Sequence, residues 1–107
     1  MSEFGKTLAR LTATIDARRG ADPKASWSAR LLSDRPLAAK KLAEEALEAA
    51  LASIQDDRDA VIAESADLVY HWLVVLAAAG VTLDEVAAKL DERDGVSGIA
   101  EKASRKK

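Results

Sequence analysis

The chain has 107 residues, 32% of them charged, and a formal net charge of −2 at neutral pH. A chain of this length can bury one small core, so we expect a single domain. The absence of cysteine excludes disulfides, thiolate zinc sites and cysteine nucleophiles. The near-neutral charge argues against a nucleic-acid partner, and charged residues close to the start argue against a signal peptide. The most apolar stretch, 68–81, is too short to span a bilayer, so we expect a cytoplasmic protein without a membrane partner.

The first predicted helix carries apolar residues at spacings of four, three and four, namely Phe4, Leu8, Leu11 and Ile15. This amphipathic pattern ends at Gly20, just before the Asp22-Pro23 pair. A short helix is expected over 26–32, with Ser26 as its N-cap. These two segments therefore predict one amphipathic helix and one short helix in the first third of the chain.

Two long helices should follow. Pro36 suits the first position of a helix that is rich in alanine and leucine and runs over about 36–54. The polar run 55–59 is short enough to make this helix an antiparallel neighbour of the next one, over about 59–79. The second long helix is apolar nearly all round, which is typical of a buried helix.

The last predicted helix begins with a capping box formed by Thr82 and Glu85 and runs to about Arg93. Its apolar residues Leu83, Val86 and Leu90 are expected to point inward. No segment shows the alternating pattern of a strand, so the predicted fold is an all-α bundle of four to five helices. We expect the domain to cover residues 1–95 and a flexible basic tail to cover 96–107.

Acidic residues interrupt both long helices. Glu44, Glu45 and Glu48 share a face of the first, and Glu64 and Asp67 share a face of the second. Turned toward each other, these faces would bring together carboxylates that repel unless a cation lies between them. Oxygen ligands are preferred by hard divalent cations, so the pattern predicts a site for Mg²⁺, with Mn²⁺ as a possible substitute.

Other interpretations of the first acidic cluster were weighed. Alone, it could be a solvated face paired with Lys40 and Lys41; Glu64 and Asp67 argue against this, since their helix is too apolar to be a solvated face. A di-iron site needs Glu three residues before His, and Leu68 stands three residues before His71. A magnesium site commonly engages phosphates.

Basic residues near the acidic clusters fit an anionic ligand. Lys40, Lys41 and Arg30 are candidates for phosphate contacts, although pairing of the lysines with the acidic residues is an equal alternative. His71 lies one turn after Asp67, and either a structural hydrogen bond or a role in supporting the site or contacting substrate is open. So short a chain cannot cover both faces of the long-helix pair, so we expect a homodimer whose central helices pack as a bundle.

Two strings of the sequence carry a resemblance: 40–48, which reads KKLAEEALE, and 64–71, which reads ESADLVYH. Together with Asp22-Pro23 and the segment 26–32, they resemble the phosphoribosyl-ATP pyrophosphohydrolase family, within the all-α nucleotide pyrophosphohydrolases of the MazG type. The resemblance extends from about Leu8 to Arg93. Trp27 stands where tyrosine is usual in that family, and Ser28 where threonine is usual.

The resemblance implies hydrolysis of phosphoribosyl-ATP to phosphoribosyl-AMP and pyrophosphate, the second step of histidine biosynthesis. It implies that Mg²⁺ on the triphosphate is held by four carboxylates, namely Glu45, Glu48, Glu64 and Asp67. Glu44 would complete the ligand set or activate water, so Glu44 and Glu45 are the candidate catalytic residues. The candidate substrate-binding residues are Lys40, Lys41, Arg30 and His71.

Two other functions are compatible with the sequence. One is a house-cleaning pyrophosphohydrolase of the same fold that acts on non-standard nucleoside triphosphates. The other is a non-catalytic helical interaction module whose carboxylates form a solvated or lysine-paired face. Such a module would not be stabilised by Mg²⁺, whereas a true metal site would be.

Overall fold

The structure is a computed structural model that describes residues 2–95. These residues form helices and connecting turns without any strand, which confirms the all-α prediction. The tail expected over 96–107 lies outside the described residues. The helices in chain order are α1 (Glu3–Ala17), α2 (Trp27–Leu32), α3 (Arg35–Ile54), α4 (Arg58–Ala79) and α5 (Leu83–Arg93).

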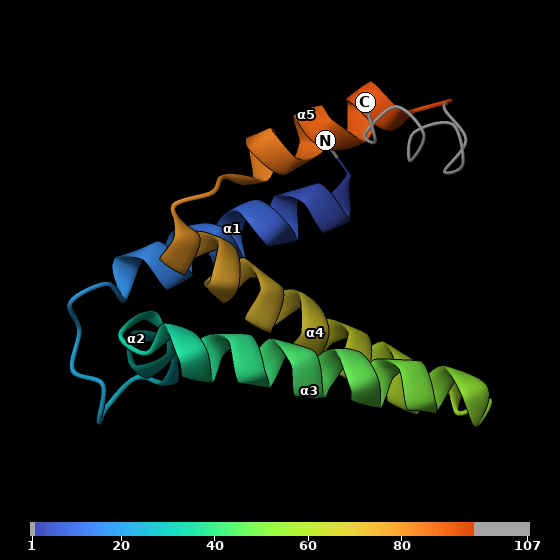
Figure 1. Ribbon diagram of the computed structural model, residues 1–107, viewed down its shortest axis with the longest axis horizontal. Coiled ribbons are helices and arrows are strands. Elements are labelled where there is room, and N and C mark those ends of the chain that lie inside the picture. The colour runs from blue at the N-terminus through green and yellow to red at the C-terminus, as the bar shows by residue number, and fades with distance from the viewer. Residues whose placement is uncertain (1, 96–107) are drawn as a thin grey trace, which may run out of the picture.

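The two longest helices, α3 and α4, lie side by side as a long hairpin (Figure 1). The connection between the two helices is short, because the Asp57 side chain accepts a hydrogen bond from the Ala60 N–H and starts α4 at Arg58. Asp56 turns the chain with a positive φ of 54°, a conformation that aspartate tolerates better than most residues. The predicted antiparallel pair of long helices is therefore confirmed.

The core lies where α1 and α2 pack on the hairpin. Its buried members come from four helices and are Ile15, Leu31, Ala38, Leu73 and Val74. The Ser26 side chain accepts a hydrogen bond from the Ala29 N–H, as expected for the N-cap of α2. Capping lets so short a helix form, and burial of Leu31 and Ala29 holds it against α3 and α4.

Helix α1 ends earlier than predicted. The sequence pattern placed its end at Gly20, whereas the last helical residue is Ala17. The N–H groups of Arg18 and Arg19 donate to carbonyls three residues earlier, which tightens the chain into a turn before Gly20 adopts a φ of 77°. The glycine therefore marks the turn that follows the helix.

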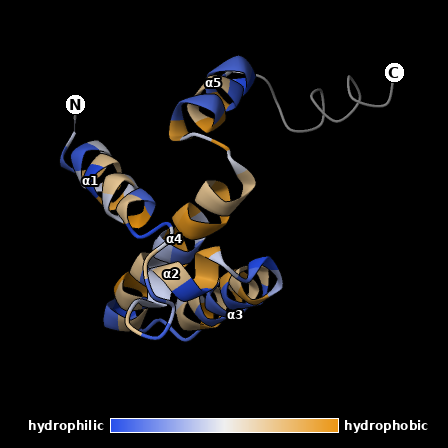
Figure 2. Ribbon diagram, turned by 90° about the vertical axis from the view of Figure 1, so that its left-hand side faces the viewer, coloured by the Kyte–Doolittle hydropathy of each residue, from blue (hydrophilic) through white to orange (hydrophobic). Residues whose placement is uncertain are grey.

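Helix α5 forms as predicted but does not pack as predicted. Thr82 and Glu85 make the expected capping box. The prediction that Leu90 points inward is wrong, because its side chain is 63% exposed, whereas Leu83 and Val86 are partly buried. Figure 2 shows the reason: α5 leaves the end of α4 and points away from the hairpin, so no described helix covers its far half.

Helix α4 is highly apolar, although few of its residues are fully buried. By length and composition alone the whole of α4, which is longer than the apolar stretch 68–81, could cross a membrane. One such helix is weak evidence, because the central helix of a soluble bundle meets the same criteria. Only His71, Leu73 and Val74 of α4 are buried within the described chain. Much of its apolar surface is therefore incompletely covered within the described chain.

Candidate metal centre

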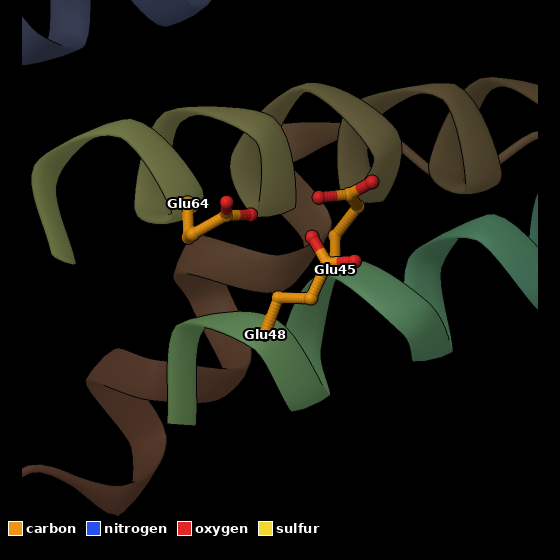
Figure 3. A group of neighbouring side chains, drawn as sticks. All are labelled: Glu45, Glu48 and Glu64. Carbon is orange, nitrogen blue, oxygen red and sulfur yellow. The ribbon is translucent and has the colours of Figure 1, made fainter. Parts of the chain in front are cut away.

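Three glutamates from the two helices of the hairpin converge on one point. Glu45 and Glu48 lie one turn apart on α3, and Glu64 faces them from α4 (Figure 3). Each offers a carboxylate oxygen, and these oxygens lie within 4.8 Å of one another. The structure thus brings together three of the four carboxylates that the sequence proposed as metal ligands.

Two of these carboxylates have a polar atom that no protein group satisfies. The Oε2 atoms of Glu45 and Glu64 are buried and have no hydrogen-bond partner among the described residues, and Glu45 as a whole residue is only 8% exposed. A buried carboxylate without a partner is strongly unfavourable. A hard cation would satisfy both oxygens at once, so the donor set fits Mg²⁺ or Mn²⁺.

The proximity of the carboxylates is also visible in the protonation of Glu64. A hydrogen bond with Glu48 raises the pKa of Glu64 to about 7, and burial and the negative charges of Glu48 and Glu45 act in the same direction. Two ionised carboxylates can only accept hydrogen bonds, so this contact needs one shared proton. A bound cation would reverse the effect by favouring the ionised form.

Lys41 joins the cluster from one turn earlier on α3. Its Nζ lies 3.1 Å from Oε2 of Glu44 and 3.8 Å from Oε1 of Glu45. The hydrogen bond to Glu44, with the negative charges of the neighbouring glutamates, raises the pKa of Lys41. Of the two roles weighed for this lysine, the described chain shows the pairing with acidic residues. Glu44 is partly buried, forms an ion pair with Lys41 and is not part of the group of three converging carboxylates.

Asp67 and His71 are linked through the backbone of α4. The Asp67 side chain is exposed and does not belong to the group of three converging carboxylates. His71 is 7% exposed, and its Nδ1 lies 2.8 Å from the Asp67 carbonyl oxygen. Because a carbonyl only accepts, Nδ1 carries the proton, and the buried Nε2 is left without a partner. Metal binding by Asp67 and substrate contact by His71 stay predictions.

The remaining predicted phosphate contacts are solvent-facing cations. Arg30 lies on α2 and Lys40 on α3, and both are exposed. Within residues 2–95 neither side chain makes an ion pair. Both are thus available to an anionic ligand, and their role stays a prediction.

Sequence reasoning missed one contact between α2 and α4. The hydroxyls of Ser28 on α2 and Tyr70 on α4 are 2.5 Å apart and form a hydrogen bond. The Tyr70 ring also meets the His71 ring edge to face, with centroids 4.9 Å apart. The partners lie far apart in the chain, so no local spacing could have revealed the contact.

Comparison with known proteins supports a specific family. The model of the phosphoribosyl-ATP pyrophosphohydrolase family matches residues 8–94. A phosphoribosyl-ATP pyrophosphatase of Caulobacter vibrioides is 61% identical over 98 residues, which cover 92% of each chain. One from Caulobacter sp. strain K31 is 55% identical over 98% of each chain.

A more distant relative agrees. A phosphoribosyl-ATP pyrophosphatase of Rhodobacter capsulatus is 54% identical over 92% of this chain and 96% of its own length. The family match includes α2, both helices that carry the converging glutamates, and α5. The chain belongs to the phosphoribosyl-ATP pyrophosphohydrolase family.

Proposed function

We propose that this protein hydrolyses phosphoribosyl-ATP to phosphoribosyl-AMP and pyrophosphate, the second step of histidine biosynthesis, with Mg²⁺ or Mn²⁺ as its cofactor. Family membership supports the reaction. The convergence of Glu45, Glu48 and Glu64, with two buried oxygens lacking any partner, carries the proposal of a metal. No other set of residues in the described chain offers such a group.

The acidic residues divide into two roles. Glu45, Glu48 and Glu64 would hold the cation, and Asp67 would join them by a side-chain rotation from its exposed position one turn after Glu64. Bound there, a divalent cation supplies neutralisation of the triphosphate charge. Its presence would also keep Glu64 ionised.

The reaction needs water as nucleophile and a group that takes its proton. The oxygen of water forms the new bond to phosphorus, the bridging P–O bond between the α- and β-phosphoryl groups breaks, and pyrophosphate leaves. Glu44 is the proposed base, because it borders the cluster and its carboxylate is held by Lys41 without being part of the converging group. Glu45, next to it in the sequence, would orient the site from its buried position.

The cations and His71 are proposed to serve the substrate. Lys41 already lies at the carboxylates, while Lys40 and Arg30 are exposed and free of ion pairs within the described residues. They would meet phosphate oxygens. His71 is too buried for a phosphate contact on the surface, so its contribution would be through the hydrogen bond that fixes the backbone at Asp67.

We also propose that the protein works as a homodimer in the cytoplasm. The apolar residues Leu47, Leu51 and Ile54 follow one stripe of α3 at helical spacing, and all three are exposed. Ile62 of α4 extends the exposed apolar surface of the hairpin. A second copy packed on this stripe would bury it together with the exposed part of α4.

Pyrophosphate release from enzymatically generated phosphoribosyl-ATP, with Mg²⁺ and with EDTA, tests the function. We expect release that depends on metal and is absent with ATP or other nucleoside triphosphates. Replacing Glu48 by Gln should reduce turnover by more than about 100-fold, since loss of groups that only support metal ligands already costs 10- to 100-fold. The Glu48 side chain is exposed, so the variant should stay folded.

The matched control is Glu92→Gln, because Glu92 is exposed on α5 and pairs with Lys89 one turn earlier on the same helix. It should keep wild-type activity. Full activity of Glu48→Gln would remove the metal proposal. Release from other nucleoside triphosphates, but not from phosphoribosyl-ATP, would instead support the house-cleaning function.

A further inference from the structure

The hydrogen bond between Ser28 and Tyr70 joins two helices at a partly buried position. Ser28 is the second residue of α2, and its neighbours Ala29 and Leu31 are buried in the core. Trp27 and Arg30 lie three residues apart on the other side of the same helix, and both are exposed to solvent. Trp27 is 44% exposed, an unusual position for so large an aromatic.

This contact lies between one and two helical turns along α4 from Glu64. Tyr70 follows Asp67 by one helical turn, and a rise of about 1.5 Å per residue places it about 9 Å along α4 from Glu64. A nucleotide held at the carboxylates by its phosphates has a similar length. Its base or sugar would therefore reach α2 if it extended in that direction.

Charge determines which direction an anionic substrate takes. Toward α2 the hairpin carries Lys40 and Lys41, and α2 itself carries Arg30. Toward the opposite end, where α3 meets α4, the chain carries a run of acidic residues broken by Arg58: Asp56, Asp57 and Asp59. A substrate with several phosphates is attracted to the first end and repelled by the second.

We infer that the Ser28–Tyr70 hydrogen bond is a positioning contact that holds α2 against α4, so that Trp27 and Arg30 form the part of the substrate site that lies beyond the carboxylates. Trp27 offers an aromatic face for stacking on a base, and Arg30 a guanidinium for an anionic group. Neither Ser28 nor Tyr70 needs to touch the substrate. The inference rests on the proposed function, because it assigns the part of phosphoribosyl-ATP that α2 holds.

Steady-state kinetics of Ser28→Ala and Tyr70→Phe test this role. Each substitution removes one hydroxyl of the hydrogen bond. We expect KM for phosphoribosyl-ATP to rise about threefold to tenfold, the range of one lost hydrogen bond, while kcat stays within about twofold. Binding of Mn²⁺ alone, followed by electron paramagnetic resonance, should be unchanged, since the carboxylates are intact.

Conservative and combined variants separate positioning from general destabilisation. Ser28→Thr keeps the hydroxyl and should restore the wild-type KM. The double variant Ser28→Ala/Tyr70→Phe should resemble either single variant, because both remove the same interaction. Ser33→Ala is the matched control: its hydroxyl donates to the Arg30 carbonyl at the end of the same helix, without reaching α4. It should leave KM unchanged.

The contrary outcomes are distinct. If Ser28→Ala and Tyr70→Phe lower the melting temperature but leave KM unchanged, the contact only stabilises the fold and the inference fails. Equal KM increases in Ser33→Ala would also refute it, because any loosening of α2 would then suffice. If the wild-type protein itself does not hydrolyse phosphoribosyl-ATP, the proposed function fails, and the inference fails with it.

Discussion

The raised pKa of Glu64 reflects the repulsion among three close carboxylates when no cation is bound. A hydrogen bond with Glu48, together with burial and the neighbouring negative charges, raises the pKa of Glu64 from 4.5 to about 7. Protonation thus relieves at neutral pH the repulsion that a cation would relieve in the loaded protein. Protons and the proposed metal would therefore compete for the same oxygens.

A pH dependence of stability follows for the metal-free protein. Between pH 4.5 and about 7 the unfolded chain loses the Glu64 proton while the folded chain keeps it. The folded state binds more protons, so the free energy of unfolding falls as pH rises through this window. In EDTA, the melting temperature of wild type should fall between pH 5 and 8 relative to that of Glu64→Gln, and Mg²⁺ should reduce the difference.

Glu85 serves as a control, because its pKa is shifted in the opposite direction to that of Glu64. Hydrogen bonds from Thr82 lower the pKa of Glu85, so its stabilising contribution is present above pH 4.5 and is lost only as pH falls below it. Glu85→Gln should therefore leave the wild-type trend between pH 5 and 8 intact. If Glu64→Gln shows the same trend as wild type, the carboxylates are not close enough to share a proton.

The sequence predicted the centre of the site better than its surroundings. Helical spacing alone put Glu45 and Glu48 on one face, and the short connection turned that face toward Glu64, as the structure confirms. Whether Asp67 points into the cluster depends on a rotamer, which spacing does not determine. The Ser28–Tyr70 contact depends on how α2 docks, which requires knowledge of the core.

At the scale of helices, local signals predicted the elements because each boundary has a local cause. Asp57, Thr82 and Ser26 each accept a hydrogen bond from a backbone N–H in the first turn, and each can be recognised from the sequence as a capping residue. The predicted end of α1 was too late, because the N–H groups of Arg18 and Arg19 donate to carbonyls three residues earlier and end the helix before Gly20. Cap chemistry fixes where a helix starts more sharply than glycine fixes where it ends.

The orientation of α5 could not be predicted from its own residues. Its amphipathic pattern implies a covered face, yet Leu90 is largely exposed in the described chain. Phe4 at the far end of α1 is exposed in the same way. Amphipathicity indicates that a face favours burial, but it does not specify which surface covers that face.

At the scale of the molecule, the exposed stripe on α3 gives the dimer its test. Leu51 lies in the middle of this stripe. Replacing it by Asp would place a charge in the proposed interface, where desolvation is costly. Light scattering after size exclusion should give wild type twice the chain mass of 11.4 kDa and Leu51→Asp the mass of one chain.

Phe4→Asp is the control, because Phe4 is also an exposed large apolar residue but lies on α1, outside the stripe of α3. It should leave the oligomeric state unchanged. A monomeric wild type, or a Leu51→Asp variant that stays dimeric, would contradict packing through this face.

The short turn between α3 and α4 also bears on the order of folding. Helices joined by so short a connection meet early, because closing a small loop costs little chain entropy. Glu45 and Glu64 are then forced together while much of the chain is still unfolded. Their repulsion should slow this step, so stopped-flow refolding should be faster in Mg²⁺ than in EDTA. Equal rates would place the meeting of the carboxylates after the barrier, and the cation would then act only by slowing unfolding.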